Sequence, residues 1–193
     1  MLYQAKALGD KEKEVLAQIE SLRRDLGYAV DQNPRRWQGL LRRSTFARNI
    51  RGSNSIEGYN VTVDDAIAAA AGEQPMEADA AAWAAVTGYR EAMTYVLQLA
   101  NDPHFRYSTD LLRSLHFMMM QHDLDKNPGR WRAGPIFVRD EGTGEVVYEG
   151  PEASAVPGLM EELITQLEGD THASGTVRGA MAHLNLVLIH PFS

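Results

Sequence analysis

The sequence predicts a mainly α-helical (all-α) fold, a helical bundle with one β-hairpin, on three observations. Apolar residues recur at helical spacing in most segments of the chain. Capping residues, glycines and prolines mark where these segments begin and end. One stretch, 134–148, has β-branched and aromatic residues on both sides of a glycine turn, as a hairpin requires. With 193 residues, 44% of them hydrophobic, the chain is long enough to bury a core.

The first predicted helix is amphipathic and lies near the N-terminus. Its apolar residues keep helical spacing at Val15, Ile19, Leu22 and Leu26. Gly27 follows them and is expected to end the helix in a left-handed cap. This helix and the next one are the candidates for pairing two copies of the chain as a homodimer.

Three further helices are predicted in the N-terminal half. Pro34 opens the second, because proline suits the first turn of a helix. Thr62 is expected to cap the start of the third, and Gly72 is expected to cap its end. The fourth is long and amphipathic, begins at Asp79 and ends before Pro103.

The C-terminal half is predicted to hold three helices and the hairpin. Ser108 begins a helix that ends before residues 127–129. After the hairpin, Pro157 stands in the first turn of another helix. The last helix begins near Val177 and is the most apolar, so it is expected at the centre of the bundle. It carries His190 at its C-terminal end.

Charge and composition argue against several classes of protein. The formal net charge of -7 argues against nucleic-acid binding and against binding to acidic membranes. The stretch 35–51 is a local exception, because it contains six arginines and no acidic residue. The chain has no cysteine, and no apolar run approaches the length of a membrane span. A cytoplasmic protein is therefore expected.

The histidines are the first candidates for chemistry. The sequence has no Walker loop, dinucleotide fingerprint, zinc-protease histidine pair or nucleophile elbow. His183 and His190 lie two helical turns apart, too far to bind one metal ion directly. A histidine at the end of a helix is most often a packed or capping residue. The neighbours of His190 favour another interpretation.

Three segments together resemble one known family. The segment Ile189-His190-Pro191-Phe192, after an apolar helix, resembles the opening of the Fic signature, which continues with Asp/Glu-Gly-Asn-Gly-Arg. The segment Ser53-Asn-Ser-Ile-Glu57-Gly58 resembles the inhibitory motif of many Fic proteins, and the hairpin 135–148 resembles their flap. The resemblance covers nearly the whole chain. It implies an N-terminal helical region at 1–75 and a Fic core at 76–193.

The resemblance implies a protein adenylyltransferase, which transfers AMP from ATP to a hydroxyl side chain of a target protein. His190 would be the general base, since an imidazole can accept and release a proton near neutral pH. Mg²⁺ would be held by a carboxylate expected beyond Ser193, and no metal ligand is expected within the chain itself. Because the sequence stops inside the signature, the chain as given is expected to be inactive as a transferase.

The resemblance also implies that Glu57 restrains the enzyme by lying over the nucleotide site. Ser53 and Glu57 are four residues apart, so in a helix they share one face, and the serine could brace the glutamate. The alternative is an ordinary helix end, with Gly58 as the cap and Glu57 in solvent.

The hairpin would hold an extended segment of the target protein by strand-like pairing. Ile136, Phe137 and Val138 are the residues expected to do so. The alternative is that their side chains cover the core, which alternation predicts for about half of them.

Two other functions remain open from the sequence. The same Glu57 geometry could position a water molecule that removes AMP from targets. Alternatively, the chain is a non-catalytic helical module whose basic stretch 35–51 binds a partner, nucleic acid included.

Overall fold

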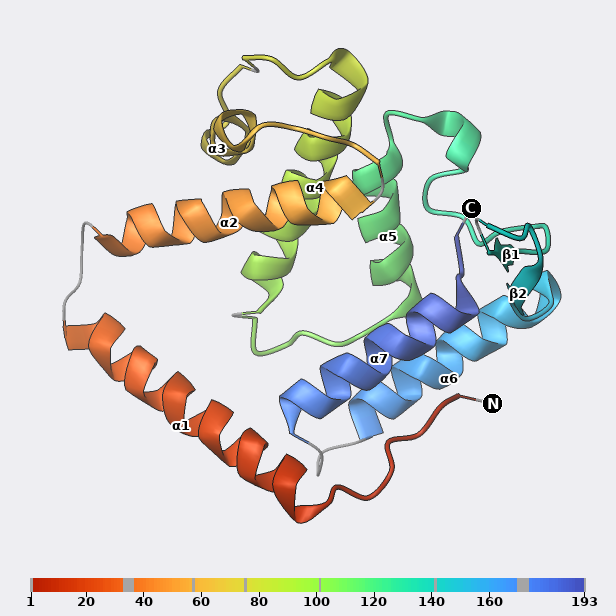
Figure 1. Cartoon of the computed structure of the whole chain (residues 1–193), viewed down its shortest axis with the longest axis horizontal. Helices are drawn as coiled ribbons and strands as arrows, with labels where there is room; N and C mark the ends of the chain where they lie inside the picture. The colour runs from red at the N-terminus through yellow and green to blue at the C-terminus, as the bar shows by residue number, and fades with distance from the viewer. Residues whose placement is uncertain are drawn as a thin grey trace. The chain divides into compact units, whose positions relative to one another are not determined.

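The structure is a computed structural model that describes residues 2–32, 37–56, 58–74, 76–100, 102–140, 142–169 and 174–192, with the backbone only at 28–32 and 37–43. Within these ranges it has seven α-helices and one two-stranded hairpin, which confirms the predicted fold class (Figure 1). The helices are α1 (Asp10–Gln32), α2 (Trp37–Ile56), α3 (Val63–Ala71), α4 (Ala80–Leu99), α5 (Thr109–Met120), α6 (Val156–Gly169) and α7 (Gly175–Ile189). The strands are β1 (Phe137–Arg139) and β2 (Val146–Glu149).

The chain divides into two compact units. Unit 1 consists of Met1–Ala17, Arg106–Ser114 and Gly129–Ser193. Unit 2 consists of Gln18–Phe105 and Leu115–Pro128. The domains predicted at 1–75 and 76–193 rest on the family resemblance and not on this division into units. They stay a prediction.

Unit 2 has an alanine-rich core between α2, α3 and α4. Ile50 of α2 and Val86 of α4 are fully enclosed. Small side chains let the three helices approach closely. A Cβ atom at Gly88 in α4 would lie 2.6 Å from the carbonyl oxygen of Met118, so α4 also lies close to the second half of α5. The buried alanines of this core are Ala47, Ala66, Ala69 and Ala82.

The predicted caps of α3 are confirmed, and the predicted start of α4 at Asp79 is an N-cap as well. The Thr62 side chain accepts a hydrogen bond from the Asp65 N–H, and the Asp79 side chain accepts one from the Ala82 N–H. Gly72 ends α3 in the left-handed region, with φ of 77°. These contacts are local, which is why the sequence pattern alone could predict them.

Asp65 ties α3 to the segment that precedes α4. Its carboxylate is fully buried and accepts hydrogen bonds from the Met76 N–H at 2.6 Å and the Glu77 N–H at 3.2 Å. The Thr62 hydroxyl donates to the same carboxylate at 3.0 Å. The Met76 hydrogen bond is the main reason that the pKa of Asp65 lies below its ordinary value, although burial acts in the opposite direction.

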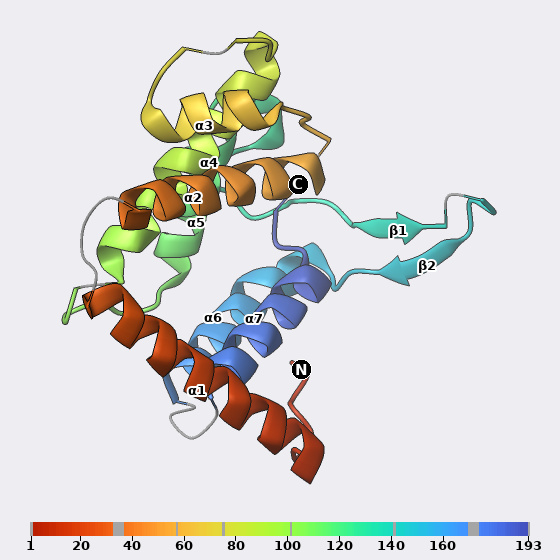
Figure 2. The same ribbon diagram turned by 60° about the vertical axis from the view of Figure 1, so that its left-hand side comes forward.

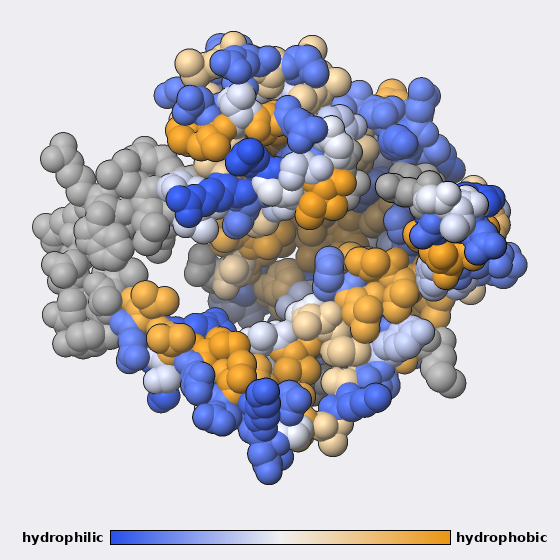
Figure 3. Space-filling model, viewed as in Figure 1, coloured by the Kyte–Doolittle hydropathy of each residue, from blue (hydrophilic) through white to orange (hydrophobic). Residues whose placement is uncertain are grey.

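The prediction that α1 ends at Gly27 is wrong. The helix continues to Gln32, and Gly27 does not take the left-handed conformation of a cap. A glycine inside a helix costs about 1 kcal/mol relative to alanine, and unbroken hydrogen bonding on both sides outweighs that. Apolar side chains along α1 are exposed, including Leu22 and Leu26 (Figure 3). In the described part of the chain, no helix has the length and apolar character needed to cross a membrane.

Unit 1 is built on α6 and α7, which lie side by side (Figures 1 and 2). Their shared core contains Met160 and Ile189, with the N-terminal residue Leu2 packed against them. The last helix was expected at the centre of the bundle, but part of its apolar face is open within the described residues, because Leu184 is 41% exposed and Val187 is 51% exposed. The other buried members of this core are Val156 and Leu163.

The hairpin extends from the helices of unit 1 (Figure 2). Phe137 pairs with Glu149, and Val138 pairs with Tyr148. A bulge follows Val138, and the turn closes with Gly144 in the left-handed region. The hairpin is therefore present as predicted, with strands shorter than the stretch 135–148.

Candidate functional site

The C-terminal end of α7 places His190 in an unusual backbone conformation. His190 has φ of 46°, which few residues other than glycine adopt. Its N–H donates to the Leu186 carbonyl at 2.9 Å and completes the last turn. Pro191 follows, lacks an N–H, and cannot continue the helix. The helix therefore stops at the histidine, whose side chain is exposed and has no hydrogen-bond partner among the described residues.

The carbonyl groups at this helix end are bound by side chains from a distant part of the sequence. The Arg132 Nε–H donates to the His190 carbonyl at 2.8 Å, and its Nη2 donates to the Ile189 carbonyl at 3.4 Å. The Tyr148 hydroxyl donates to the Leu188 carbonyl. A helix leaves its last carbonyls without partners, and a cation near that end is favoured by the helix dipole.

Two aromatic rings close the same turn. The Trp131 and Phe192 ring centroids lie 5.0 Å apart. The Arg132 N–H donates to the Pro191 carbonyl at 2.9 Å, so residues 131–132 run alongside the residues that follow α7. Arg113 of α5 lies over the Trp131 ring at 5.9 Å, a distance typical of a cation–π contact.

The hairpin carries the three residues predicted to dock a target. Phe137 and Val138 are 43% and 49% exposed, whereas Ile136 is partly buried. A two-stranded ribbon leaves one edge of each strand without a partner, and such an edge can pair with an added strand. The alternative, in which about half of these side chains cover the core, fits Ile136 alone.

The structure brings His190 and the hairpin together in unit 1. Arg132 makes the link, because its Nη1 also donates to the Gly134 carbonyl at 2.7 Å and its Nη2 to the Pro151 carbonyl. Gly134 precedes β1 and Pro151 follows β2. One buried side chain therefore binds both ends of the hairpin and the turn at His190.

The residues of the predicted inhibitory motif belong to unit 2, and Glu57 itself lies outside the described residues. The Ser53 hydroxyl donates to the Tyr89 hydroxyl of α4 at 3.0 Å. Gly58 has φ of 85°. Its role as a helix cap is thus confirmed, while the inhibitory role of the motif stays a prediction.

The end of α2 has the hydrogen bonds of a Schellman motif. The Gly58 N–H donates to the Ser55 carbonyl at 3.2 Å, and the Tyr59 N–H donates to the Asn54 carbonyl at 2.9 Å. Both partners lie within the same few residues of the chain. These two bonds pair carbonyls of the last turn of α2 with the backbone that directly follows the helix.

The basic stretch 35–51 lies on α2 in part. Arg48 and Arg51 border a hollow of about 840 Å³ in unit 2, lined also by residues of α3. Arg42 and Arg43 have side chains outside the described set. The non-catalytic interpretation of this stretch stays a hypothesis.

No metal centre is formed by the part of the chain that the structure describes, where no three His, Asp or Glu side chains come together. The carboxylate that would hold Mg²⁺ stays an expectation of the family resemblance. ATP binding also stays an expectation of the family resemblance.

Sequence reasoning missed Arg132 and Tyr148 as residues of the site. Arg132 is 5% exposed and stands in a segment without regular secondary structure. Its one signal was chemical, since an arginine between Trp131 and a Gly-Pro turn needs partners if it is buried. Burial raises the pKa of Tyr148, so its hydroxyl stays a donor.

Asn185 of α7 was missed as well. It is 2% exposed, and its side-chain amide accepts from the Tyr3 N–H at 2.8 Å and donates to the Tyr3 carbonyl at 3.0 Å. The backbone of the N-terminal segment is therefore bound to α7 through the Asn185 side chain, which pairs with both polar backbone groups of Tyr3. Unit 1 depends on it for part of its core.

Comparison with known proteins gives one family. The model of the Fic/DOC family matches residues 106–193. A Fic family protein from Desulfovibrio desulfuricans is similar over 98% of this chain, with 26% identity and a TM-score of 0.78. No match was found among curated proteins.

Two further solved structures share the fold. A Fic domain containing signaling protein from Bacteroides thetaiotaomicron is similar over 83% of this chain, with 20% identity and a TM-score of 0.70. Fic-1 from C. elegans is similar over 96%, with 20% identity and a TM-score of 0.63. The chain covers 55%, 62% and 58% of these three proteins, less than two thirds of each.

Proposed function

Residues 106–193 match the model of the Fic/DOC family, and from this premise we propose that the protein is an adenylyltransferase acting on other proteins. It transfers AMP from ATP to a hydroxyl side chain of its target. The hydroxyl oxygen forms a bond to the α-phosphorus, the bond from that phosphorus to the pyrophosphate oxygen breaks, and pyrophosphate leaves. Mg²⁺ would neutralise phosphate charge when bound, and its carboxylate ligand is expected after Phe192.

The geometry of His190 is the observation that carries this proposal. Its backbone is held in the left-handed region, and its imidazole is exposed with no partner among the described residues. Non-glycine residues in such conformations cost about 1–2 kcal/mol and are found where function requires them. An accessible imidazole can take the proton of the attacking hydroxyl.

The exposed edge of the hairpin supports the same proposal. Phe137 and Val138 offer apolar side chains and an unpaired strand edge in the unit that carries His190. A target segment that pairs with this edge would bring its hydroxyl to the histidine. The target then binds through main-chain hydrogen bonds and two apolar contacts.

The decisive test is transfer of α-labelled phosphate from ATP to protein, using a protein that carries the complete signature. His190→Ala should reduce transfer at least about 100-fold, the usual contribution of a general base. His183→Ala, which removes an exposed histidine from the same helix, is the matched control and should keep activity. Equal activity of the two variants would refute the role of His190.

We also propose that Glu57 restrains this activity. The support is the sequence motif, together with Ser53 in the last turn of α2 and Gly58 as the cap after it. Glu57→Gly should increase transfer, and Glu57→Gln should do so as well if the charge is the restraint. No increase in either variant would exclude autoinhibition by this residue.

A further inference from the structure

Arg132 binds more of the site than any sequence motif suggested. Its three guanidinium nitrogens donate to carbonyl oxygens of His190, Ile189, Gly134 and Pro151. The side chain is 5% exposed, and among the described residues it has no carboxylate partner. The positive charge of Arg132 is therefore stabilised by carbonyl dipoles. The planar guanidinium group has several N–H donors and can bind these carbonyls at the same time.

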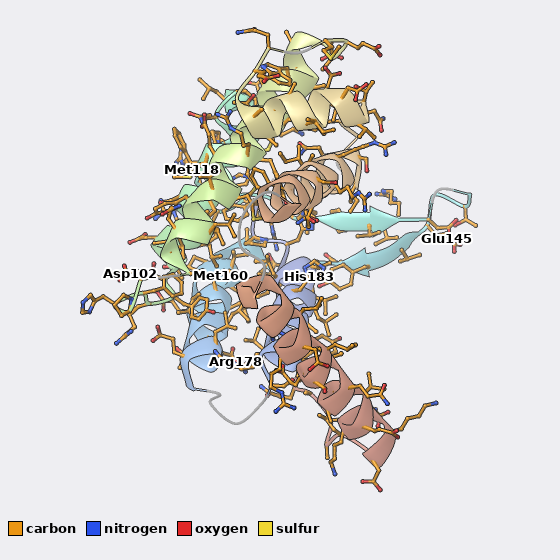
Figure 4. All side chains as sticks on the ribbon, turned by 90° about the vertical axis from the view of Figure 1, so that its left-hand side faces the viewer. Asp102, Met118, Glu145, Met160, Arg178 and His183 are labelled. Carbon is orange, nitrogen blue, oxygen red and sulfur yellow. The ribbon has the colours of Figure 1, made fainter. Side chains whose placement is uncertain are left out.

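These four carbonyls belong to two structures with different tasks. Two of them end α7 at the histidine, and two flank the hairpin. The Tyr148 hydroxyl, from β2, reaches the Leu188 carbonyl and makes a second link between the same two structures. The hairpin is otherwise exposed along much of its length, with Glu145 close to its far end (Figure 4).

The geometry points to Arg132 as a positioning residue that holds the His190 turn and the base of the hairpin as one body; this inference rests on the proposed function. A target segment paired with the hairpin is thereby held at a fixed distance from the imidazole. Placing the hydroxyl for attack on the α-phosphorus raises the rate of the chemical step far more than tighter binding of the target does. Loss of the link through Arg132 is therefore expected to lower kcat and to leave ATP binding unchanged.

Gly150 gives independent support for a crowded junction. A Cβ atom there would lie 2.5 Å from Ile136 Cγ2 and 3.4 Å from Arg132 Nη2. The Gly150 N–H donates to the Ile136 carbonyl at 3.0 Å, so the two hairpin ends meet beside the guanidinium. Gly150→Ala should push Ile136 away and loosen the hairpin without touching the arginine's charge.

The test needs no ATP and no target. In Arg132→Gln, the amides of His190 and Gly150 should exchange with deuterium at least about 10-fold faster, and the His190 ring resonance should shift and sharpen as the ring gains mobility. Arg132→Lys should not rescue these readouts, because one ammonium cannot span both structures. Tyr148→Phe should show a smaller change in the same direction if Arg132→Gln does not fold.

The matched control is Arg178, which lies on α7 and, like Arg132, donates to a helix-end carbonyl, that of Leu167 at 2.7 Å (Figure 4). Arg178→Gln should leave the His190 and Gly150 amides unchanged, and the His183 resonance should be constant in the Arg132 variants. Folded Arg132 variants with native exchange at His190 and Gly150 would overturn the inference, as would full rescue by lysine.

Activity separates this inference from the proposed function. With the complete signature present, Arg132→Lys should lower kcat about 10-fold or more with the KM for ATP unchanged. If the unmutated protein transfers no AMP, the proposed function fails, while the exchange results still decide whether Arg132 couples the hairpin to His190.

Discussion

Two kinds of helix end occur in this molecule, and they are closed in different ways. In unit 2, α2 and α3 each end in a left-handed glycine, and the next residue donates back into the last turn. In unit 1, α7 ends in a left-handed histidine followed by proline, which has no N–H to donate. The carbonyls of α7 are bound by Arg132 and Tyr148 instead.

The difference lies in where the hydrogen-bond donors at the helix end come from. A glycine cap is a local device that needs only neighbours in the sequence. His190 keeps a strained conformation because side chains from residues 132–148 hold it there, and strain of this kind persists only when surroundings over-determine it. The end of α7 thus depends on two side chains from outside its helix, whereas α3 adds to its glycine cap one hydrogen bond, from Arg90 Nη1 to the Ala69 carbonyl at 3.3 Å.

The largest effect is expected from removing the distant support. Arg132→Met removes the donor from one buried and three partly buried carbonyls, at about 1–3 kcal/mol for each one left unpaired, so the free energy of unfolding should fall by about 3 kcal/mol or more. Arg178→Met loses a single hydrogen bond and should cost about 1 kcal/mol. Urea denaturation of both variants tests this, and equal costs would remove the distinction between the two helix ends.

A smaller loss of stability is expected when the glycine that caps α3 is replaced. Gly72→Ala places a side chain at φ of 77°, which should cost about 1–2 kcal/mol. A Cβ atom there meets only the tip of Arg90 at 3.4 Å, so the cost reports backbone strain and not overpacking. Thermal unfolding measures it, and an unchanged midpoint would mean that α3 does not need its left-handed cap.

A glycine substitution at His190, the left-handed residue at the end of α7, should raise the stability of the protein and not lower it. His190→Gly relieves the left-handed strain and should stabilise the protein by about 0.5–1 kcal/mol, while abolishing transfer. Asn127, the other non-glycine residue in this region, has φ of 48° and suits it better, so Asn127→Gly should gain less. A destabilised His190→Gly protein would show that the imidazole itself supports the fold.

The smallest effect is expected from acid, and it should fall on unit 2. Hydrogen bonds, that of Met76 first, hold the pKa of Asp65 below its ordinary value, so its stabilisation is present above about pH 4 and is lost as pH falls through the lower folded value. Asp65→Asn should flatten the loss of stability below pH 4. Parallel acid profiles of the two proteins would assign the effect to other carboxylates.

The sequence predicted the parts of the fold that rest on short-range contacts. The predicted caps at Thr62 and Gly72 rest on residues three or four positions away, as does the helix start predicted at Asp79. The predicted end of α1 at Gly27 failed because a glycine is a frequent cap and also a tolerated helical residue. Composition cannot distinguish these two uses.

The candidate site divides in the same way. His190 was predicted as a site residue from a motif and the hairpin from a strand pattern, and the structure has both of them in unit 1. Arg132 was not predicted, since its partner His190 is 58 positions away and no periodic pattern marks such a pair. Only a three-dimensional arrangement shows that the two belong together.

The two hydrogen bonds between Tyr3 and Asn185 bear on the order in which the protein folds during synthesis. These residues are 182 positions apart, and Leu2 packs in the same core as Ile189. A nascent chain therefore cannot complete unit 1 until α7 has left the ribosome, whereas residues 18–128 supply unit 2 much earlier in synthesis. During translation Leu2 and Tyr3 therefore stay unburied until α7 has emerged.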